Sequence, residues 1–261
     1  MRRLAHQRTG EGSRPLVLLH GFLGSARNLS TLARALVERD PDLGIVAFDL
    51  TGHGASPPLP PGADSATLAG DVVASARALG LPTPLTLVGH SLGGRVALRA
   101  ALLEPASVAS LTLLDIPPGP LDDTGGAGRV EDTLRRAPAL VATRGEARAH
   151  LVADGVPGVL ADWLLLNLEP AEGGYRWRVD REALAALHAR ITGEDLWPAV
   201  EGRHAYAVRC VRGAKSGYVS DADVRRLRAA GCPVATIEGA DHFVHAERPR
   251  ETAAAILDGL A

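Results

Sequence analysis

The chain has 261 residues, of which 46% are hydrophobic and 22% are charged, and its formal net charge at pH 7 is −2. This composition is typical of a soluble globular protein with enough apolar side chains for a buried core. A net charge near zero argues against a nucleic-acid groove or a polybasic membrane surface. No run approaches the roughly 18 apolar residues of a membrane span.

Two cysteines, Cys210 and Cys232, are too few for a disulfide framework and lack metal-ligand spacing. The N-terminal segment lacks the apolar stretch of a signal peptide, so we expect a cytoplasmic protein.

Short apolar runs alternate with helical patterns through the first part of the chain. The runs end in glycine or aspartate, as buried strands often do, and the segments between them carry apolar residues at helical spacing. The predicted strands are residues 15–21, 43–49, 85–89 and 108–115, and the predicted helices are 29–37, 64–79 and 92–103. Strands that alternate with helices indicate a mostly parallel sheet with helices on both faces.

This alternation stops after Asp115 and returns near His204. Residues 116–128 are rich in turn formers, and the pattern from about 129 to 203 is helical without clear strands. Strands at 205–213 and 232–239 then alternate with helices at 221–230 and 249–260. An insertion of this length must have its own structure. We predict a core formed by 1–117 and 204–261, with 118–203 as a helical cap over the carboxyl edge of the sheet.

A serine between glycines follows the strand predicted at 85–89. Gly89, Ser91 and Gly93 fit the pattern Gly-x-Ser-x-Gly, and a predicted helix begins at once. Such a tight strand-to-helix turn lifts the hydroxyl out at the carboxyl end of the strand, as a nucleophile requires. The alternative is an ordinary serine in a glycine-flanked turn, but the strand and helix around it favour a nucleophile.

Two backbone amides are candidates for an oxyanion hole. The start of a helix leaves N–H groups unpaired, so the amide of Leu92 would point at negative charge that develops beside Ser91. The second donor is expected in the loop after the strand at 15–21, where the amide of Phe22 can face Ser91. His20 is expected to orient this loop.

Nine histidines are candidates for the general base that a serine nucleophile needs. His242 follows the last predicted strand and precedes the last helix, which places it in a loop at the active edge of the sheet. His245 is the rival, three residues further on. The turn at the serine should point the side chain of His90 away, and His53 is expected to stabilise a turn. We predict His242.

The base in turn needs a buried carboxylate that fixes its tautomer. In many proteins with a Ser–His pair on such a sheet, this acid follows the strand after the cap, where the present chain has Ser216. Asp115 instead ends the strand that follows the helix of the serine, although it could simply cap a turn. We predict Asp115 as the acid, with Asp221 as the second candidate. Asp241 adjoins His242 and cannot easily reach round to its ring.

These segments together resemble the α/β-hydrolase superfamily over nearly the whole chain. Within it they are similar to the acyl-hydrolase branch that includes YbfF-type and ABHD-eleven-type esterases. The resemblance is carried by "LHGFLGSARNLSTLA", "FDLTGHGASP", "GHSLGGRVAL", "LTLLDIPP", "VRGAKSGYV" and "GADHFVHAERP", and most specifically by "WLLLNL" and "GGYRWRVD" in the cap. In that branch the acid lies after the strand that follows the nucleophile helix. The resemblance therefore implies Ser91, His242 and Asp115 as nucleophile, base and acid.

We therefore expect a serine hydrolase of carboxylic esters or thioesters with short- to medium-chain acyl groups. It would act through an acyl-enzyme intermediate, without a metal or cofactor, on a small-molecule substrate. Trp163, Leu164 and Trp177 are candidates for the wall of the pocket, although each could equally belong to the core of the cap.

Two alternatives to this function stay open. The first is a lyase of the type found in menaquinone synthesis, which uses a similar triad for proton abstraction. In such a lyase Arg95 would hold a substrate carboxylate, although a buried ion pair is the simpler role for this arginine. The second alternative is a ligand-binding protein that has kept the triad as a pocket without turnover.

Overall fold

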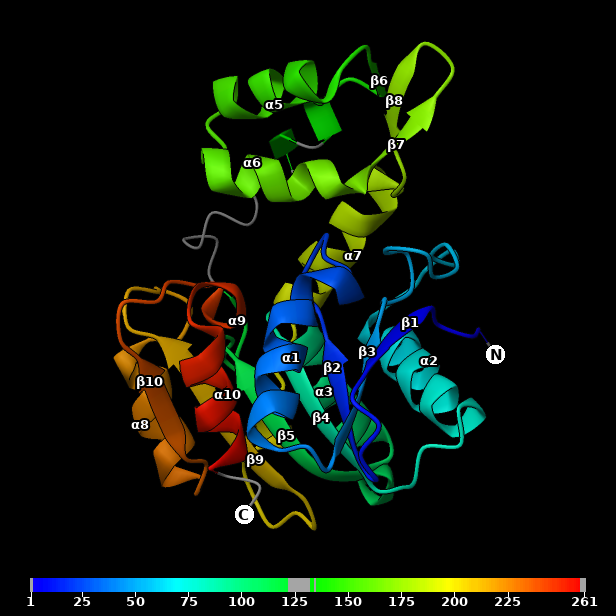
Figure 1. The fold of residues 1–261 in the computed structure, drawn as a ribbon. Helices are drawn as coiled ribbons and strands as arrows, with labels where there is room; N and C mark the ends of the chain where they lie inside the picture. Colours follow the sequence, from blue (N-terminus) through cyan, green and yellow to red (C-terminus); the bar gives the residue numbers. More distant parts are fainter. Residues whose placement is uncertain (1, 122–131, 134, 259–261) are drawn as a thin grey trace.

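Seven strands form a single twisted sheet in the computed structural model, which describes residues 2–121, 132–133 and 135–258. The spatial order is β1-β3-β2-β4-β5-β9-β10 (Figure 1). The strands are β1 (His6–Thr9), β2 (Arg14–Leu19), β3 (Leu43–Phe48), β4 (Leu85–His90), β5 (Val108–Leu114), β9 (Ala207–Gly213) and β10 (Val234–Ile237). Every neighbouring pair is parallel except β1 with β3. The sequence did not predict β1, because three of its four residues are exposed and carry no apolar pattern.

Helices cover both faces of this sheet, as the alternation in the sequence predicts. One face carries α1 (Ser30–Arg39), α9 (Val244–Glu247) and α10 (Pro249–Leu257), and the other carries α2 (Ser65–Ala78), α3 (Leu92–Leu103) and α8 (Asp221–Ala229). Successive side chains of a strand point to opposite faces. Leu16 and Leu18 of β2 accordingly pack with the first group, and Val17 and Leu19 pack with the second. None of the helices that the structure describes is long and apolar enough to span a bilayer.

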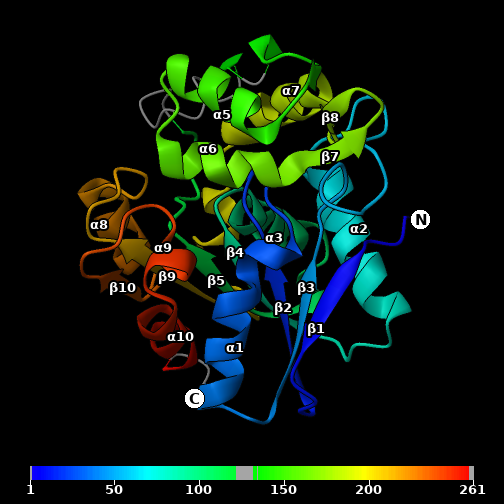
Figure 2. The same ribbon diagram turned by 45° about the horizontal axis from the view of Figure 1, so that its top comes forward.

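The segment between β5 and β9 folds as a separate layer at the carboxyl edge of the sheet (Figure 2). Its described residues include the helices α5 (Arg144–Ala153), α6 (Gly158–Leu164) and α7 (Arg181–Thr192). It also contains a small antiparallel sheet of β6 (Leu140–Val141), β8 (Gly174–Trp177) and β7 (Leu168–Ala171), which the sequence analysis did not predict. These strands have two to four residues, too few for an alternating pattern to stand out from the helical background.

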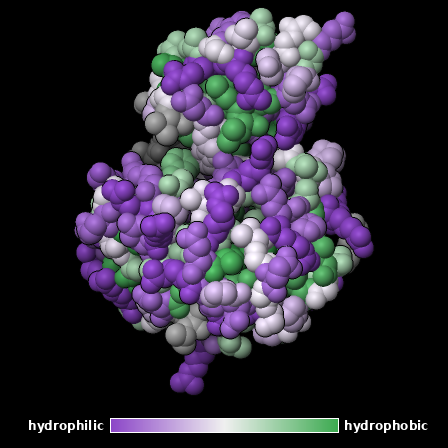
Figure 3. Space-filling view, in the orientation of Figure 1, coloured by the Kyte–Doolittle hydropathy of each residue, from purple (hydrophilic) through white to green (hydrophobic). Residues whose placement is uncertain are grey.

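We refer to the layer of residues 135–192 as the cap. Residues 122–131 and 134 of the predicted insertion lie outside the described part of the chain, and the division into 1–117, 118–203 and 204–261 stays our proposal. The molecular surface narrows where the cap meets the core (Figure 3).

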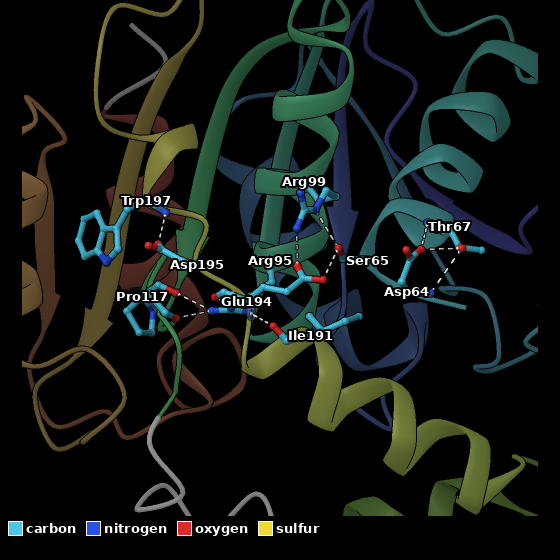
Figure 4. A network of polar contacts seen from close by, with 11 residues as sticks. Asp64, Ser65, Thr67, Arg95, Arg99, Pro117, Ile191, Glu194, Asp195 and Trp197 are labelled. Atoms are coloured by element: carbon cyan, nitrogen blue, oxygen red, sulfur yellow. Dashed lines mark hydrogen bonds and ion pairs between the residues drawn. The ribbon is translucent and has the colours of Figure 1, made fainter. Parts of the chain in front are cut away.

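A buried arginine joins the two segments that connect the cap to the core (Figure 4). The guanidinium of Arg95, on α3, donates to the carbonyl oxygens of Pro117 and Gly119, where the chain leaves the core, at 3.2 and 2.7 Å. It also donates to the carbonyl oxygens of Ile191 and Glu194, at the end of α7 and just after it. Beside it, Arg99 pairs with the Glu194 carboxylate at 2.9 Å and donates to the Ser65 hydroxyl at 2.8 Å. The same view shows Asp64 and Thr67, whose contacts cap the start of α2. Both connections of the cap are therefore fixed to α3, the helix that follows Ser91.

Candidate active site

Ser91 lies in a strained turn between β4 and α3, as the sequence predicts. Its backbone angles are φ +50° and ψ −116°, outside the usual regions for a residue with a side chain. A Cβ atom on Gly89 would clash with the carbonyl oxygen of Gly93, and one on Gly93 would clash with the carbonyl oxygen of Leu19. The glycines therefore permit the close approach of strand and helix that this turn requires. Backbone strain of this kind costs about 1–3 kcal/mol and persists mainly at functional sites.

Asp115 and His242 form a hydrogen-bonded pair at the carboxyl ends of β5 and β10. The Asp115 side chain is fully buried, and its Oδ2 lies 2.8 Å from Nδ1 of His242. The amide of Gly213 donates to Oδ1 at 2.9 Å, and the hydroxyl of Ser216 donates to Oδ2. Because the Asp115 carboxylate accepts a hydrogen bond from Nδ1, the proton of a neutral His242 lies on Nδ1. Nε2 then keeps a lone pair that can accept a proton.

The other acids considered from the sequence lie elsewhere or make different contacts. Asp221 begins α8 on the surface and pairs with Arg212 at 2.9 Å. Asp241 accepts from the backbone amide of His242 at 2.8 Å rather than from its ring. Ser216 follows β9, the strand after the cap, where many proteins with such a sheet have the acid. Its hydroxyl donates a hydrogen bond to Asp115. Asp115 is thus the carboxylate that the structure brings to the His242 imidazole.

The rival histidines are too deeply buried to act readily as bases. Burial, with a smaller contribution from the nearby His242, lowers the pKa of His245 to about 3. Burial also lowers the pKa of His90 well below its ordinary value. A side chain with so low a pKa is a weak proton acceptor at neutral pH. His90 instead lies 3.0 Å from the backbone oxygen of His242, through its Nε2.

The loop after β2 passes directly beside Ser91. The amide of Gly24 donates to the carbonyl of Gly21 at 3.0 Å, which closes a tight turn with Leu23 at φ +57°. A Cβ atom on Gly21 would lie 2.7 Å from the His90 ring and 3.4 Å from Cβ of Ser91. Within the described residues the amides of Phe22 and Leu92 make no hydrogen bond, so both can donate to a ligand.

His20 and His53 support this loop from beneath. Nδ1 of His20 lies 2.7 Å from the carbonyl oxygen of Gly21, and its Nε2 accepts from the amide of Leu50 at 2.9 Å. The ring of His53 packs edge-on against that of His20. Burial lowers the pKa values of His20 and His53 to about 4 and about 3, so both stay neutral at pH 7. The expected orienting role of His20 agrees with these contacts.

A mostly apolar pocket connects these groups. Core and cap both contribute to its lining, which consists of Phe22, Leu23, His90, Ser91, Leu160, Trp163, Leu164, His188, Tyr218, His242 and Phe243. The sequence analysis named Trp163 and Leu164 as candidates for this wall. Trp177, the third candidate, lies outside the lining and donates from Nε1 to the carbonyl of Pro138 within the cap. Ser91 and His242 both line the pocket, although the hydrogen bonds of the described residues do not include one between them.

Two aromatic contacts in the pocket were not foreseen from the sequence. The ring of Tyr218 stacks on that of His242, with centroids 3.8 Å apart and planes 15° apart, and so holds the imidazole on one face. The ring of His188, on α7, stacks on Phe22 with centroids 4.1 Å apart. A histidine on the apolar stripe of a helix was the only signal for His188, and such a residue usually belongs to the core.

Arg95 cannot serve as a ligand for a substrate carboxylate in this arrangement. Its side chain is buried away from the pocket, and its donors bind the four carbonyl oxygens of the cap connections. Burial lowers its pKa to about 10, so it stays charged at neutral pH. It also differs from the simpler expectation of an ion pair, because backbone oxygens rather than a carboxylate satisfy it. Among the residues that the structure describes, no group of three or more His, Cys, Asp or Glu side chains is arranged to hold a metal ion.

The family model described as "Alpha/beta hydrolase family" matches residues 16–255. The chain belongs to the alpha/beta hydrolase family. It is 32% identical over 261 residues to the sn-1-specific diacylglycerol lipase ABHD11 of Xenopus laevis, a match that covers 94% of this chain and 78% of the relative. It is 30% identical over 253 residues to esterase YbfF of Escherichia coli, covering 90% and 88% of the two chains.

The solved structure of a marine microorganism esterase superimposes on this α/β-hydrolase with a TM-score of 0.88. The two chains are 25% identical, and the match covers 99% of each. The resemblance stated from the motifs, the fold class and the expectation of an enzyme of the carboxylesterase type are thereby confirmed.

Proposed function

We propose that this α/β-hydrolase cleaves carboxylic esters or thioesters with Ser91 as nucleophile, His242 as general base and Asp115 as the acid that orients it. The observation that carries this proposal is the 2.8 Å contact of Asp115 with Nδ1 of His242, in the pocket that the strained Ser91 also lines. This arrangement leaves Nε2 of His242 with a lone pair that can accept a proton.

In the first half of the reaction, Nε2 of His242 takes the hydroxyl proton as Oγ of Ser91 attacks the acyl carbonyl carbon. The hydroxyl and Nε2 come within hydrogen-bond reach when substrate fills the pocket, as often happens on forming the reactive complex. The carbonyl oxygen becomes negative and accepts from the amides of Phe22 and Leu92. His242 then gives its proton to the oxygen or sulfur of the leaving group, which departs as an alcohol or thiol. The acyl group stays bound to Oγ of Ser91.

In the second half, water replaces the alcohol or thiol. His242 takes a proton from the water as its oxygen attacks the acyl carbon, and it returns that proton to Oγ as the carboxylic acid leaves. Asp115 stabilises the imidazolium during both halves without itself being protonated. Each oxyanion donor contributes about 3–4 kcal/mol to the transition state in comparable sites.

The lining of the pocket supports an apolar acyl group as the bound part of the substrate. Leu23, Leu160, Leu164, Trp163 and Phe243 offer hydrocarbon and aromatic surface beside Ser91. The names of the relatives, a diacylglycerol lipase and an esterase, point to ester bonds with acyl chains. We therefore place short- to medium-chain acyl esters and thioesters first among the substrates.

A panel of p-nitrophenyl esters and acyl thioesters of increasing chain length tests this function. We expect turnover by the wild-type protein and a loss of at least a thousandfold in Ser91→Ala, with the stability of the variant unchanged. Covalent labelling of Ser91 by a fluorophosphonate should accompany turnover. Absence of hydrolysis across the panel would favour a ligand-binding role, and equal turnover by Ser91→Ala would rule out the proposed nucleophile.

A further inference from the structure

One side chain of the cap bonds directly to the loop that holds the proposed oxyanion donor. Asn167 ends a short 3-10 turn (Leu165–Asn167) between α6 and β7, and its side chain is buried against the core. Its Nδ2 donates to the carbonyl of Leu23 at 2.8 Å and to that of Leu164, the last residue of α6, at 3.3 Å. The first of these hydrogen bonds crosses 144 positions of sequence, from the cap to the loop after β2.

The turn that carries Asn167 is itself held firmly within the cap. The guanidinium of Arg144 donates to the carbonyls of Leu165 and Leu168, on either side of Asn167, at 2.7 and 2.9 Å. The amide of Arg178 donates to the carbonyl of Asn167 at 2.8 Å. The amide group of Asn167 is therefore presented to the core from a fixed backbone.

The loop that receives this hydrogen bond needs support. Leu23 adopts φ +57°, a left-handed conformation that residues other than glycine rarely adopt. Its carbonyl belongs to the turn closed by Gly24 and Gly21, in which the Phe22 amide makes no hydrogen bond to the described residues. A second cap residue, His188, stacks on the ring of Phe22. The cap thus holds both central residues of the turn, one through its carbonyl oxygen and the other through its side chain.

We propose that Asn167 is a positioning residue for the oxyanion hole: its donation to the Leu23 carbonyl holds the turn that aims the Phe22 amide at the carbonyl oxygen of the substrate. This inference rests on the proposed function. The cap is then part of the catalytic apparatus, because the oxyanion hole is complete only while Asn167 contacts the loop after β2. The cap would then do more than cover the acyl chain.

Three variants separate this role from a general effect on the cap. Asn167→Ala removes the donor, and Asn167→Asp keeps the shape but replaces the NH2 group by an oxygen that repels the Leu23 carbonyl. Trp177→Phe is the matched control, because it removes a hydrogen bond of 3.0 Å from Trp177 to Pro138 that lies wholly within the cap. For each variant, kcat and KM on a p-nitrophenyl ester are measured beside the affinity for an alkyl trifluoromethyl ketone, which forms a negatively charged tetrahedral adduct with serine.

We expect kcat to fall at least tenfold in Asn167→Ala with KM changed less than threefold, and the affinity for the ketone to fall by a similar factor. Asn167→Asp should lose at least as much, and its activity relative to wild type should recover as the pH falls and the new carboxyl is protonated. Trp177→Phe should keep kcat within twofold of wild type. Ser91→Ala is assayed in the same series.

The outcomes distinguish the two proposals. Wild-type kcat and ketone affinity in both Asn167 variants, with Ser91→Ala inactive, would overturn the role of Asn167 alone. An equal loss of kcat in Trp177→Phe would also overturn it, because any loosening of the cap would then suffice. Failure of the wild type to turn over esters, or full activity of Ser91→Ala, would overturn the proposed function and this inference with it.

Discussion

At the scale of single side chains, the histidines around the pocket differ in what their rings contact. His20, His53, His90 and His245 are buried among apolar groups and other rings, and burial holds their pKa values low. His242 instead has a carboxylate at Nδ1, a tyrosine ring on one face and a side chain that is 14% exposed. A buried carboxylate stabilises the imidazolium that forms when the base takes a proton. His242 is therefore the histidine best placed to accept and return a proton during turnover.

The acid is tested by a matched pair of substitutions. Asp115→Asn keeps the shape of the side chain but removes the charge that fixes the tautomer of His242, so we expect kcat/KM to fall by about 10^4-fold. Asp221→Asn should leave kcat/KM within twofold, because that side chain lies on the surface and pairs with Arg212. The measurement is steady-state hydrolysis of one p-nitrophenyl ester. A large loss of kcat/KM in Asp221→Asn and none in Asp115→Asn would show that Asp221 is the acid.

The sequence was sufficient to propose the triad but not to predict the groups that contact it. Ser91 is indicated by a local motif, and Asp115 and His242 by their places at the ends of strands. Ser216, Tyr218 and Asn167 act across long sequence separations, through contacts that no local pattern encodes. A Ser, Tyr or Asn in a loop has many possible partners, and only the fold selects one of them.

At the scale of secondary-structure elements, the turn at Ser91 depends on how closely the start of α3 approaches β4 and the end of β2. This approach explains why the predicted helix at 92–103 coincides with α3, since the turn fixes its first residue. The short strands of the cap and the exposed edge strand β1 could not be predicted in this way. Their side chains are largely exposed or intermediate, so burial leaves no periodic trace in the sequence.

Two glycine-to-alanine substitutions test this account of the turn. In Gly93→Ala the new Cβ would meet the backbone oxygens of Leu19 and His20, so we expect a loss of more than about 2 kcal/mol in the free energy of unfolding. Ester hydrolysis should be lost with it. In Gly70→Ala, within α2, the Cβ meets nothing within 4 Å, so the variant should gain about 0.5–1 kcal/mol from helix propensity. Urea unfolding measures both, and a tolerated Gly93→Ala would contradict the close approach.

At the scale of the whole molecule, two separate sets of hydrogen bonds fix the cap to the core. Arg95 donates to both connecting segments, and Asn167 donates to the loop beside Ser91. The pocket receives side chains from both layers. An insertion held in this way acts as a second wall of the site rather than as a loosely tethered lid.

Stability should depend on pH through the buried histidines. His20, His53 and His245 have pKa values of about 4, 3 and 3 in the fold, against about 6.5 in the unfolded chain. Below pH 6.5 the unfolded chain binds protons that the folded chain does not, so the free energy of unfolding falls as the pH falls. Each histidine accounts for about 2 kcal/mol between pH 7 and pH 5.

Urea unfolding at pH 7 and at pH 5 measures this effect. We expect a loss of several kcal/mol in the wild type and a smaller loss in His53→Gln, in which one of the buried titrating groups is gone. Equal stability of the wild type at the two pH values would show that these rings are protonated in the fold without penalty.

The central claim is that Ser91 carries the acyl group between the two halves of the reaction. Mass spectrometry of the protein, quenched during turnover of a p-nitrophenyl ester and digested, tests it most directly. We predict an acyl mass on the peptide that contains Ser91 in the wild type and none in Ser91→Ala. An acyl group found on another residue, or undiminished turnover in Ser91→Ala, would contradict the account.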